Sequence, residues 1–407
     1  MARSEALGIK RLEDITFVVN DIERSTRFYT GNLDFALTAE SGNALEARSG
    51  ERTRVFEADR CRVTVVQPLS PTSIAGRYLK RHPDGITTLV FEVADVAETF
   101  RVLESRGATI VDDIAWSTRG MGPAKDGEAS TVGRLGWFDI TTPFGEGRFR
   151  FLQRSDWTGP NPGLESRLRH PAEGLEPVTA PATANRFGFE QYDHVTSNFL
   201  TLKPMVLWCK EVLGLEEYWD IEFHTDSDDK TATSGHGSGL KSIVLWDPHS
   251  GVKFANNEPK RPHFESSQIY GFVVDNLGEG FQHAAITTPD IIGTVRSLRE
   301  RGVTFMPTPG SYYDLLPKRM LDLGVGVIDE DVEVLRGLQI LVDGKGPGSY
   351  LLQIFLKEAA GLYGDDKAGP FFFEVIQRKG DKGFGGGNFR ALFESIEHEQ
   401  KKHRTAG

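Results

Sequence analysis

Two segments in different halves of the chain share one spacing, and this repeat restricts the possible folds. One runs from Asp95 to Gly107 and the other from Asp290 to Gly302, with 12 residues from the aspartate to the glycine in both. Each pattern predicts an amphipathic helix, because glycine favours the left-handed residue that follows a helix. Thr288 or Asp290 can cap the second helix. A similar helix is therefore predicted once in each half.

A strand is predicted before each of these helices, at residues 88–93 and 283–287. A second pair of similar segments opens each half, where residues 12–17 and 192–195 precede two further predicted helices. The pattern predicts four modules, each a strand, a helix and several further strands (βαβββ), in an α+β chain. Two modules per domain can form a half-open curved β-barrel that helices flank and that surrounds a cavity.

The length of the chain and a change in composition indicate where the domains divide. A chain of 407 residues is long enough for two domains, each with its own core. Residues 156–187 are rich in proline and lack hydrophobic periodicity, which is typical of a linker. We therefore expect an N-terminal domain at 1–155, a linker at 156–187 and a C-terminal domain at 188–407.

Charge and cysteine content exclude several classes of partner and site. With 47 Lys and Arg against 58 Asp and Glu, the net charge is −11, the wrong sign for binding nucleic acid or an anionic membrane. Two cysteines are too few for a disulfide framework or a cysteine-ligated metal. Neither an export signal nor an apolar stretch long enough to span a membrane is visible. We expect a cytoplasmic protein without nucleic-acid or membrane partners.

Three residues of the C-terminal half are candidates for holding a metal. His194 and His283 occupy equivalent points on the first strands of two modules, and Glu374 lies in an apolar late strand. A buried carboxylate without a partner would cost several kcal/mol, so Glu374 needs a cation, a proton or a hydrogen-bond donor. A single histidine on a strand is more often an ordinary core or surface residue. Together, two imidazoles and one carboxylate on one face are typical of non-haem Fe(II) sites with open positions.

The repeat provides an internal comparison for these three residues. Alignment of the two halves places Ile15 opposite His194, Thr88 opposite His283, and Arg150 opposite the carboxylate of the second half. Such a set is unsuitable for iron. We therefore expect the N-terminal domain to be metal-free, and the chain to hold one metal.

Several longer motifs identify a resemblance. They are residues 193–194, 238–242, 257–259, 267–269, 282–283, 290–291, 352–355, 372–378 and 383–389. The paired modules resemble the vicinal oxygen chelate (glyoxalase and extradiol dioxygenase) superfamily, and the motifs resemble its 4-hydroxyphenylpyruvate dioxygenase family. The likeness covers nearly the whole chain and is weaker over the N-terminal half.

This resemblance implies a specific reaction and cofactor. Members of the family are Fe(II)-dependent enzymes that convert 4-hydroxyphenylpyruvate and O₂ to homogentisate and CO₂ in tyrosine and phenylalanine catabolism. The implied ligands of the single Fe(II) are His194, His283 and Glu374. O₂ is the co-substrate, and 2-oxoglutarate is not required because the aromatic substrate carries its own α-keto acid.

The resemblance also implies which residues line the substrate pocket. They are Ser242, Asn257, Gln268, Gln353, Phe355, Phe372, Phe384, Asn388 and Phe389. Strand alternation agrees in part, since it places Phe372 on the face of Glu374 and pairs Gln353 with Phe355. The phenylalanines are suitable walls for an aromatic substrate, and the amides and hydroxyl can bind a phenol and a keto acid. Gln282 belongs to a family motif, but alternation points it away from its neighbour His283.

A terminal helix is predicted beyond residue 388, because apolar residues recur there at helical spacing. One hypothesis makes this helix a lid over the active site, with Phe384, Asn388 and Phe389 facing the substrate. The alternative is a helix that only completes the core.

Two other functions remain open from the sequence. Hydroxymandelate synthase acts on the same substrate, although Asn257 and Phe355 keep the dioxygenase pattern. A non-catalytic binding protein of the same fold is the second alternative, and retention of all three ligands argues against it. Departures from the family are Ala255, Lys241, Leu356 and the stretch 318–335. We also expect a homo-oligomer assembled through the N-terminal domain.

Overall fold

The computed structural model describes most of the chain in two compact units. The described residues are 3–120, 132–157, 159–161, 163–164, 175–178, 185–224 and 239–388. The N-terminal unit comprises Met1–Asn185, Lys203–Glu216 and Leu245–Lys253. The C-terminal unit comprises Arg186–Leu202, Glu217–Val244 and Phe254–Gly407. The boundaries expected at 155 and 188 stay a prediction.

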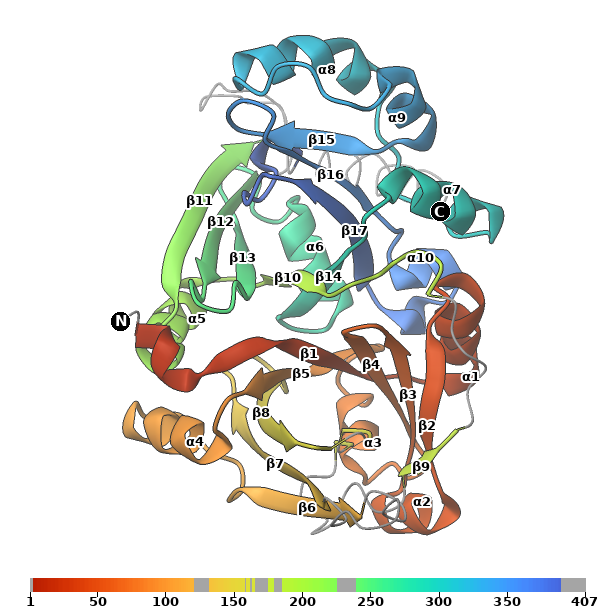
Figure 1. Cartoon of the computed structure of the whole chain (residues 1–407), viewed down its shortest axis with the longest axis vertical. Coiled ribbons are helices and arrows are strands. Elements are labelled where there is room, and N and C mark those ends of the chain that lie inside the picture. The colour runs from red at the N-terminus through yellow and green to blue at the C-terminus, as the bar shows by residue number, and fades with distance from the viewer. Residues whose placement is uncertain are drawn as a thin grey trace, which may run out of the picture. The chain divides into compact units, whose positions relative to one another are not determined.

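A curled nine-stranded sheet with the order β6-β7-β8-β5-β1-β4-β3-β2-β9 forms the N-terminal unit (Figure 1). Its strands are β1 (Ile9–Val18), β2 (Ala36–Ser41), β3 (Glu51–Ala58), β4 (Cys61–Pro68), β5 (Gly85–Val93), β6 (Ala115–Gly120), β7 (Val132–Thr141), β8 (Arg148–Ser155) and β9 (Leu175–Pro177). Its helical segments are η1 (Arg3–Leu7), α1 (Ile22–Thr26), η2 (Arg27–Asn32), α2 (Asn43–Ser49), α3 (Ile74–Tyr78), α4 (Val96–Ser105), α5 (Lys203–Trp208) and η3 (Cys209–Leu213). β9 comes from the predicted linker and pairs with β2.

The C-terminal unit repeats this plan with an eight-stranded sheet of order β11-β12-β13-β10-β14-β17-β16-β15. Its strands are β10 (Tyr192–Asn198), β11 (Glu216–His224), β12 (Gly239–Trp246), β13 (Lys253–Pro259), β14 (Gly280–Thr287), β15 (Leu341–Gly344), β16 (Tyr350–Phe355) and β17 (Phe372–Lys379). Its helical segments are α6 (Gln268–Asp275), α7 (Ile291–Glu300), α8 (Gly310–Asp322), α9 (Val332–Leu338), α10 (Ala359–Tyr363) and η4 (Asp366–Ala368). α8 and α9 contain much of the unusual stretch 318–335.

Strand pairing shows that the two units are built from the same modules. In the N-terminal unit β1 pairs antiparallel with β5, while β1·β4 and β5·β8 are parallel. In the C-terminal unit β10 pairs antiparallel with β14, while β10·β13 and β14·β17 are parallel. The predicted α+β fold, four modules in two curled half-barrels with helices around them, is confirmed. The expected terminal helix lies outside the described residues from 389 onward.

The repeated helices form where the spacing predicted them. Asp95 caps α4 by accepting hydrogen bonds from two backbone N–H groups, and Asp290 caps α7 by accepting one from Gly293. Gly107 and Gly302 follow these helices with a φ of 82° each, a conformation that other residues rarely adopt. Asp290, rather than Thr288, is therefore the capping residue of α7.

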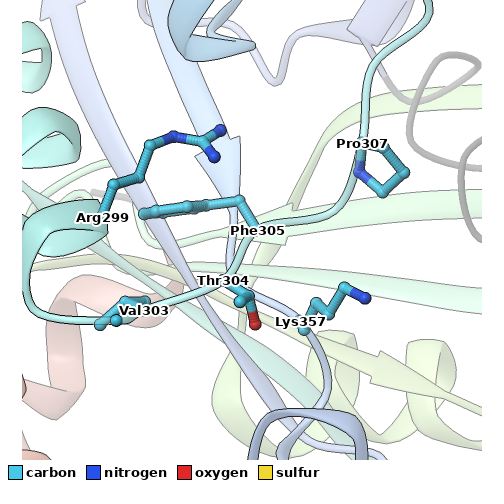
Figure 2. A pocket seen from close by; sticks show the side chains of 7 residues that line it. Arg299, Val303, Thr304, Phe305, Pro307 and Lys357 are labelled. Carbon is cyan, nitrogen blue, oxygen red and sulfur yellow. The ribbon is translucent and has the colours of Figure 1, made fainter.

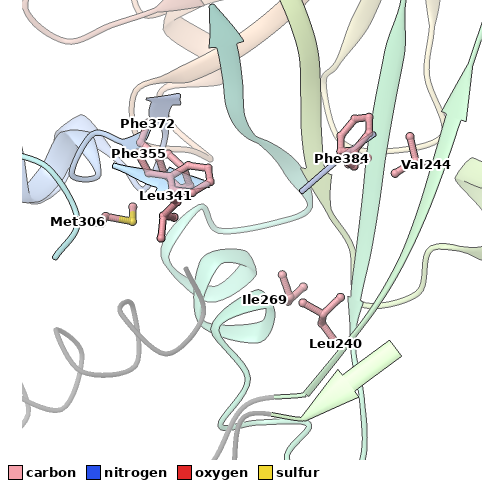
Figure 3. Close-up of a cluster of buried hydrophobic side chains, with 9 residues drawn as sticks. Leu240, Val244, Ile269, Met306, Leu341, Phe355, Phe372 and Phe384 are labelled. Carbon is pink, nitrogen blue, oxygen red and sulfur yellow. The ribbon is translucent and has the colours of Figure 1, made fainter. Parts of the chain in front are cut away.

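Inside the curled sheet of the C-terminal unit lies a cluster of buried apolar side chains (Figure 3). Phe355 and Phe372 contribute from β16 and β17, and Phe384 contributes from the chain that follows β17. Leu240 and Ile269 add side chains from β12 and α6. This apolar interior surrounds the site described next. Among the described residues, none of the helices has the length and apolar character needed to cross a membrane.

Candidate metal centre

His194, His283 and Glu374 meet on three neighbouring strands, β10, β14 and β17. The Nε2 atom of His194 lies 3.2 Å from Oε2 of Glu374, and Nε2 of His283 lies 3.5 Å from the same oxygen. One ligand atom from each of the three residues lies within 4.8 Å of the others, and all three side chains are buried. The structure thus brings the predicted metal ligands together.

Strand register explains why two of these ligands approach so closely. On β14, Ala285 is the partner both of His194 on β10 and of Glu374 on β17. Partners in neighbouring strands point to the same face of a sheet. A methyl group is therefore all that lies between the imidazole and the carboxylate in this row. The larger side chains can lean over Ala285 and meet.

The three side chains fit a metal ion. Two ligands at right angles, each about 2.1 Å from an ion, are about 3 Å apart, close to the 3.2 and 3.5 Å that separate the two histidines from Glu374. The second carboxylate oxygen of Glu374, Oε1, is buried without a hydrogen-bond partner among the described residues. Such an oxygen is costly in a protein interior unless a cation or donor reaches it. A two-histidine, one-carboxylate face leaves further coordination positions open.

The two imidazoles differ in their electrostatic surroundings. Burial lowers the pKa of His194, but the Glu374 carboxylate and the hydrogen bond to Asp193 outweigh burial, so this pKa lies above its usual value. Burial, with a smaller contribution from the charge of His194, holds the pKa of His283 well below its usual value. Metal ligation needs neutral imidazoles, so any proton on Nε2 of His194 would have to leave before a metal binds there.

An acceptor holds the outer nitrogen of each histidine, and in both cases it belongs to the preceding residue. Nδ1 of His194 lies 2.8 Å from Oδ1 of Asp193, and Nδ1 of His283 lies 3.1 Å from Oε1 of Gln282. Gln282, expected to point away, therefore reaches the ring through its amide. Asp193 in turn accepts two hydrogen bonds from Arg378. Asp193 and Arg378 were missed by the sequence reasoning, although an acceptor before each histidine was a readable signal.

Predicted aromatic wall residues lie directly against the histidines. Phe372 stacks on His283 with ring centroids 4.8 Å apart, and Phe384 lies 4.6 Å from the ring of His194. Phe355 meets Phe372 edge to face at 6.1 Å and also contacts His283. These rings surround the triad with apolar surface. Their contact with a substrate stays a prediction.

Predicted polar residues share the same buried interior. Ser242, Asn257, Gln268, Gln353 and Asn388 are each no more than 3% exposed. Within the described part of the chain, the Ser242 hydroxyl, Oδ1 of Asn257 and Nδ2 of Asn388 have no hydrogen-bond partner. Buried polar atoms of this kind usually contact water or a ligand. Phe389 lies outside the described residues.

Two further polar residues in this interior were not predicted. Thr196 and Asn198 alternate with His194 along β10, and the Thr196 hydroxyl and Nδ2 of Asn198 are buried without partners among the described atoms. Oδ1 of Asn198 accepts a hydrogen bond from Asn257. Strand alternation from His194 was the signal that could have found both residues.

Strand pairing in the N-terminal unit shows that one residue of the predicted alignment between the two halves was wrong. Asp14 pairs with Val90, as His194 pairs with Ala285, so Asp14 and not Ile15 corresponds to His194. Both first strands contain a register shift just before this residue, so the two strands correspond without a gap, with Glu13 opposite Asp193 and Asp14 opposite His194. Register agrees that Thr88 and Arg150 correspond to His283 and Glu374.

In the N-terminal unit, two of the residues that correspond to the metal ligands pair with other protein side chains. Arg150 makes two hydrogen bonds to Asp139, at 2.6 and 2.9 Å, and both side chains are buried. Burial raises the pKa of Asp14, which accepts hydrogen bonds from Thr64 and Asn161. Within the described ranges, the one cluster of three possible metal ligands is the triad of the C-terminal unit.

A separate open pocket of about 430 Å³ lies beside the chain that follows α7 (Figure 2). It is lined by Arg299, Gly302, Val303, Thr304, Phe305, Pro307 and Lys357. The Arg299 guanidinium lies over the Phe305 ring and donates to the backbone oxygen of Leu338. None of the predicted site residues lines this pocket.

Comparison with known proteins agrees with this architecture. The model of the glyoxalase/bleomycin resistance protein/dioxygenase superfamily matches residues 11–126 and 191–316. A solved triple mutant of 4-hydroxymandelate synthase from Streptomyces coelicolor aligns with a TM-score of 0.69 over 97% of this chain and 99% of its own. At 24% identity, that likeness supports the fold alone.

Curated relatives are similar over almost the full length. The 4-hydroxyphenylpyruvate dioxygenase of Caenorhabditis elegans is 32% identical over 96% of this chain and 92% of its own. That of Dictyostelium discoideum is 31% identical over 96% of this chain and 98% of its own. That of Pseudomonas aeruginosa is 32% identical over 85% of this chain and 84% of its own. The chain therefore belongs to the 4-hydroxyphenylpyruvate dioxygenase family of enzymes, within the glyoxalase and dioxygenase superfamily.

Proposed function

We propose that this dioxygenase uses Fe(II), held by His194, His283 and Glu374, to convert 4-hydroxyphenylpyruvate and O₂ to homogentisate and CO₂. The observation that carries the proposal is the buried meeting of these three side chains beside aromatic rings and unpartnered polar atoms. The names of the relatives support the substrate. The reaction would belong to tyrosine and phenylalanine catabolism in the cytoplasm, with one Fe(II) per chain.

Iron bound at this face would supply the redox chemistry of O₂ and a Lewis-acidic centre for the keto acid. The protein's own residues would bind, orient and shield. Asp193 and Gln282 accept hydrogen bonds at the outer imidazole nitrogens and so fix the ring orientations. No 2-oxoglutarate is needed, because the aromatic substrate carries the α-keto acid.

We assign substrate orientation to the side chains around the triad. Phe355 and Phe372 stand at 88° to each other and offer a corner into which an aromatic ring can pack. Neutral amides from Asn257, Gln268 and Gln353 and the Ser242 hydroxyl are suited to the phenol and the keto acid. Phe384, Asn388 and Phe389 would complete the pocket and exclude water.

The closest competing function differs only in the product. Hydroxymandelate synthase acts on the same substrate, and the choice would depend on how the pocket holds the aromatic ring. Phe355 and Asn257 keep the pattern of the dioxygenase family, which favours homogentisate. Non-catalytic binding of a small molecule is the remaining alternative.

Product analysis tests the proposal. Purified protein is loaded with Fe(II) without oxygen, then mixed with 4-hydroxyphenylpyruvate and O₂ but no 2-oxoglutarate. We expect O₂ uptake, equimolar CO₂ and homogentisate by chromatography, all abolished in His194→Ala while the circular dichroism spectrum is kept. Formation of 4-hydroxymandelate would replace the proposed product with the alternative. Substrate binding without O₂ uptake would indicate a binding protein.

A further inference from the structure

One guanidinium group in the C-terminal unit joins two parts of the candidate site. Nε and Nη2 of Arg378 donate to the two carboxylate oxygens of Asp193 at 2.6 and 2.7 Å. Nη1 of Arg378 donates to the backbone oxygens of Asp381 and Gly383 at 2.9 and 2.8 Å. The Arg378 side chain is 18% exposed and Asp193 is 6% exposed, so solvent screens these bonds only in part.

On one side, this arrangement sets the orientation of a metal ligand. Oδ1 of Asp193 lies 2.8 Å from Nδ1 of His194. An ionised carboxylate only accepts hydrogen bonds, so Nδ1 carries a proton and Nε2 is the atom left to bind a metal. Holding Asp193 with two bonds from Arg378 limits rotation of the carboxylate and, through it, of the His194 ring.

On the other side, Arg378 holds the start of the glycine-rich segment, defined here as residues 381–388. Phe384 follows Gly383 directly, and its ring lies 4.6 Å from the ring of His194. Gly385 has a φ of 65°, and a side chain there would come within 2.7 Å of Oε1 of Gln353. The backbone carbonyls held by Arg378 therefore determine where this segment passes over the site.

We propose that Arg378 is a positioning residue that couples the orientation of the ligand His194 to the position of the glycine-rich segment. The inference rests on the proposed metal site. It means that metal affinity and order in residues 381–388 depend on each other, since coupling between two sites is reciprocal. Arg378 acts through Asp193 and the backbone, and touches neither metal nor substrate.

The N-terminal unit contains a similar arginine–carboxylate pair without the metal ligands. Nε of Arg154 donates to Oε1 of Glu13 at 2.9 Å, and Nη2 lies 2.7 Å from the same oxygen and donates to Oδ1 of Asn161. Nη1 donates to the backbone oxygen of Gly159 at 3.1 Å. Glu13 precedes Asp14, the counterpart of His194. Arg154 thus resembles Arg378 in pairing with the carboxylate before this position and with a backbone oxygen, but it has no histidine to orient. It supplies a matched control that separates positioning from a general role in stability.

Anaerobic Fe(II) titration by calorimetry tests the first half of the coupling. We expect Arg378→Gln to weaken Fe(II) binding by about 10- to 100-fold, the usual effect of losing a contact behind a metal ligand. Arg154→Gln should change Fe(II) affinity by less than about 2-fold, even if it lowers the melting temperature as much. Equal Fe(II) affinity in Arg378→Gln and the wild type would overturn the proposal.

Hydrogen exchange measured by mass spectrometry tests the second half. In the wild type we expect Fe(II) to slow exchange at the hydrogen-bonded amides of Gly383, Gly387 and Asn388, and in Arg378→Gln we expect that protection to be lost. Unchanged exchange in the wild type on Fe(II) binding would refute the coupling, and this experiment stands even if Arg378→Gln does not fold. A wild-type protein that binds no Fe(II) at all would instead overturn the proposed metal site.

Discussion

Ala285 is the small side chain that allows His194 and Glu374 to approach each other. It is the strand partner of both His194 and Glu374, and it is fully buried against Leu351 and Ile376. The residue was not a candidate in the sequence, because a small apolar side chain on a central strand has no chemical signature. Its role follows only from the register of three strands.

We predict that Ala285→Leu lowers Fe(II) affinity by at least about 10-fold and the free energy of unfolding by about 1–3 kcal/mol, because a larger side chain would separate the ligands and overpack the interior. Anaerobic Fe(II) calorimetry and urea denaturation measure the two effects. Ala285→Ser, which is close in size, should keep Fe(II) affinity within about 3-fold. Unchanged Fe(II) affinity in Ala285→Leu would show that a small residue between His194 and Glu374 is not needed for metal binding.

Glu358 is a half-buried carboxyl whose titration affects stability. Burial, with the nearby charge of Asp275, raises its pKa from 4.5 to about 7. A raised pKa means that the folded state binds the proton more tightly than the unfolded state does. The stability contributed by this group is therefore fully present below about pH 4.5 and is lost as the pH rises through 7.

We predict that Glu358→Gln becomes more stable than the wild type as the pH rises from 5 to 8, by about 1–2 kcal/mol, since the side chain keeps some contact with solvent. Urea denaturation across this pH range measures the difference. The two proteins should converge near pH 4.5. A difference that stays constant with pH would mean that Glu358 titrates normally.

The part of the site that could be predicted from the sequence consists of residues whose type alone indicates metal binding. His194, His283 and Glu374 are recognisable as a set because the repeat gives them equivalent places and a buried carboxylate needs a partner. The contacts of Asp193 with Arg378 were missed because the two residues lie on different strands, far apart in the chain. Only the tertiary fold brings them together.

Among the elements, the repeated helices α4 and α7 were the most predictable. Each combines an aspartate cap, an apolar face and a closing glycine within one local segment. Strand register was less predictable. Ile15 was assigned in place of Asp14, although β1 and β10 carry the same irregularity before this residue and correspond without a gap; only the pairing with the next strand fixes the match.

The caps of α4 and α7 provide a matched pair of tests. We predict that Asp95→Ala and Asp290→Ala each lower the free energy of unfolding by about 0.5–2 kcal/mol, because each exposes helix N–H groups that lose their acceptor. Urea denaturation measures both. Replacement by Ser, which also caps, should restore most of the loss. An Ala variant as stable as the wild type would show that the aspartate cap does not stabilise the start of that helix.

On the scale of the whole molecule, the two units follow one plan and differ in what the equivalent buried positions hold. The C-terminal unit has the possible metal ligands, and the N-terminal unit has Asp14, Thr88 and Arg150, with Arg150 paired to Asp139. One metal per chain stays a prediction. Assembly into a homo-oligomer through the N-terminal domain stays a prediction, to be tested by light scattering.

We predict that Arg150→Met lowers the free energy of unfolding by about 3–5 kcal/mol, because Asp139 would be left buried without its ion-pair partner. The double variant Arg150→Met/Asp139→Leu should recover most of this loss, since an apolar pair of similar size removes the stranded charge. Urea denaturation measures both variants, and Fe(II) stoichiometry should stay at one per chain. A single variant as stable as the wild type would show that the ion pair contributes nothing.

The buried Arg150–Asp139 pair has a consequence for how the N-terminal unit depends on metal supply. A guanidinium keeps its charge at any pH a cell reaches, and here its own carboxylate already balances it. The N-terminal unit thus has a fixed positive charge, the Arg150 guanidinium, at the position that corresponds to a candidate metal ligand of the C-terminal unit. Within the described residues of this unit, the position that corresponds to Glu374 therefore provides no carboxylate for a metal, and its charge does not depend on metal supply.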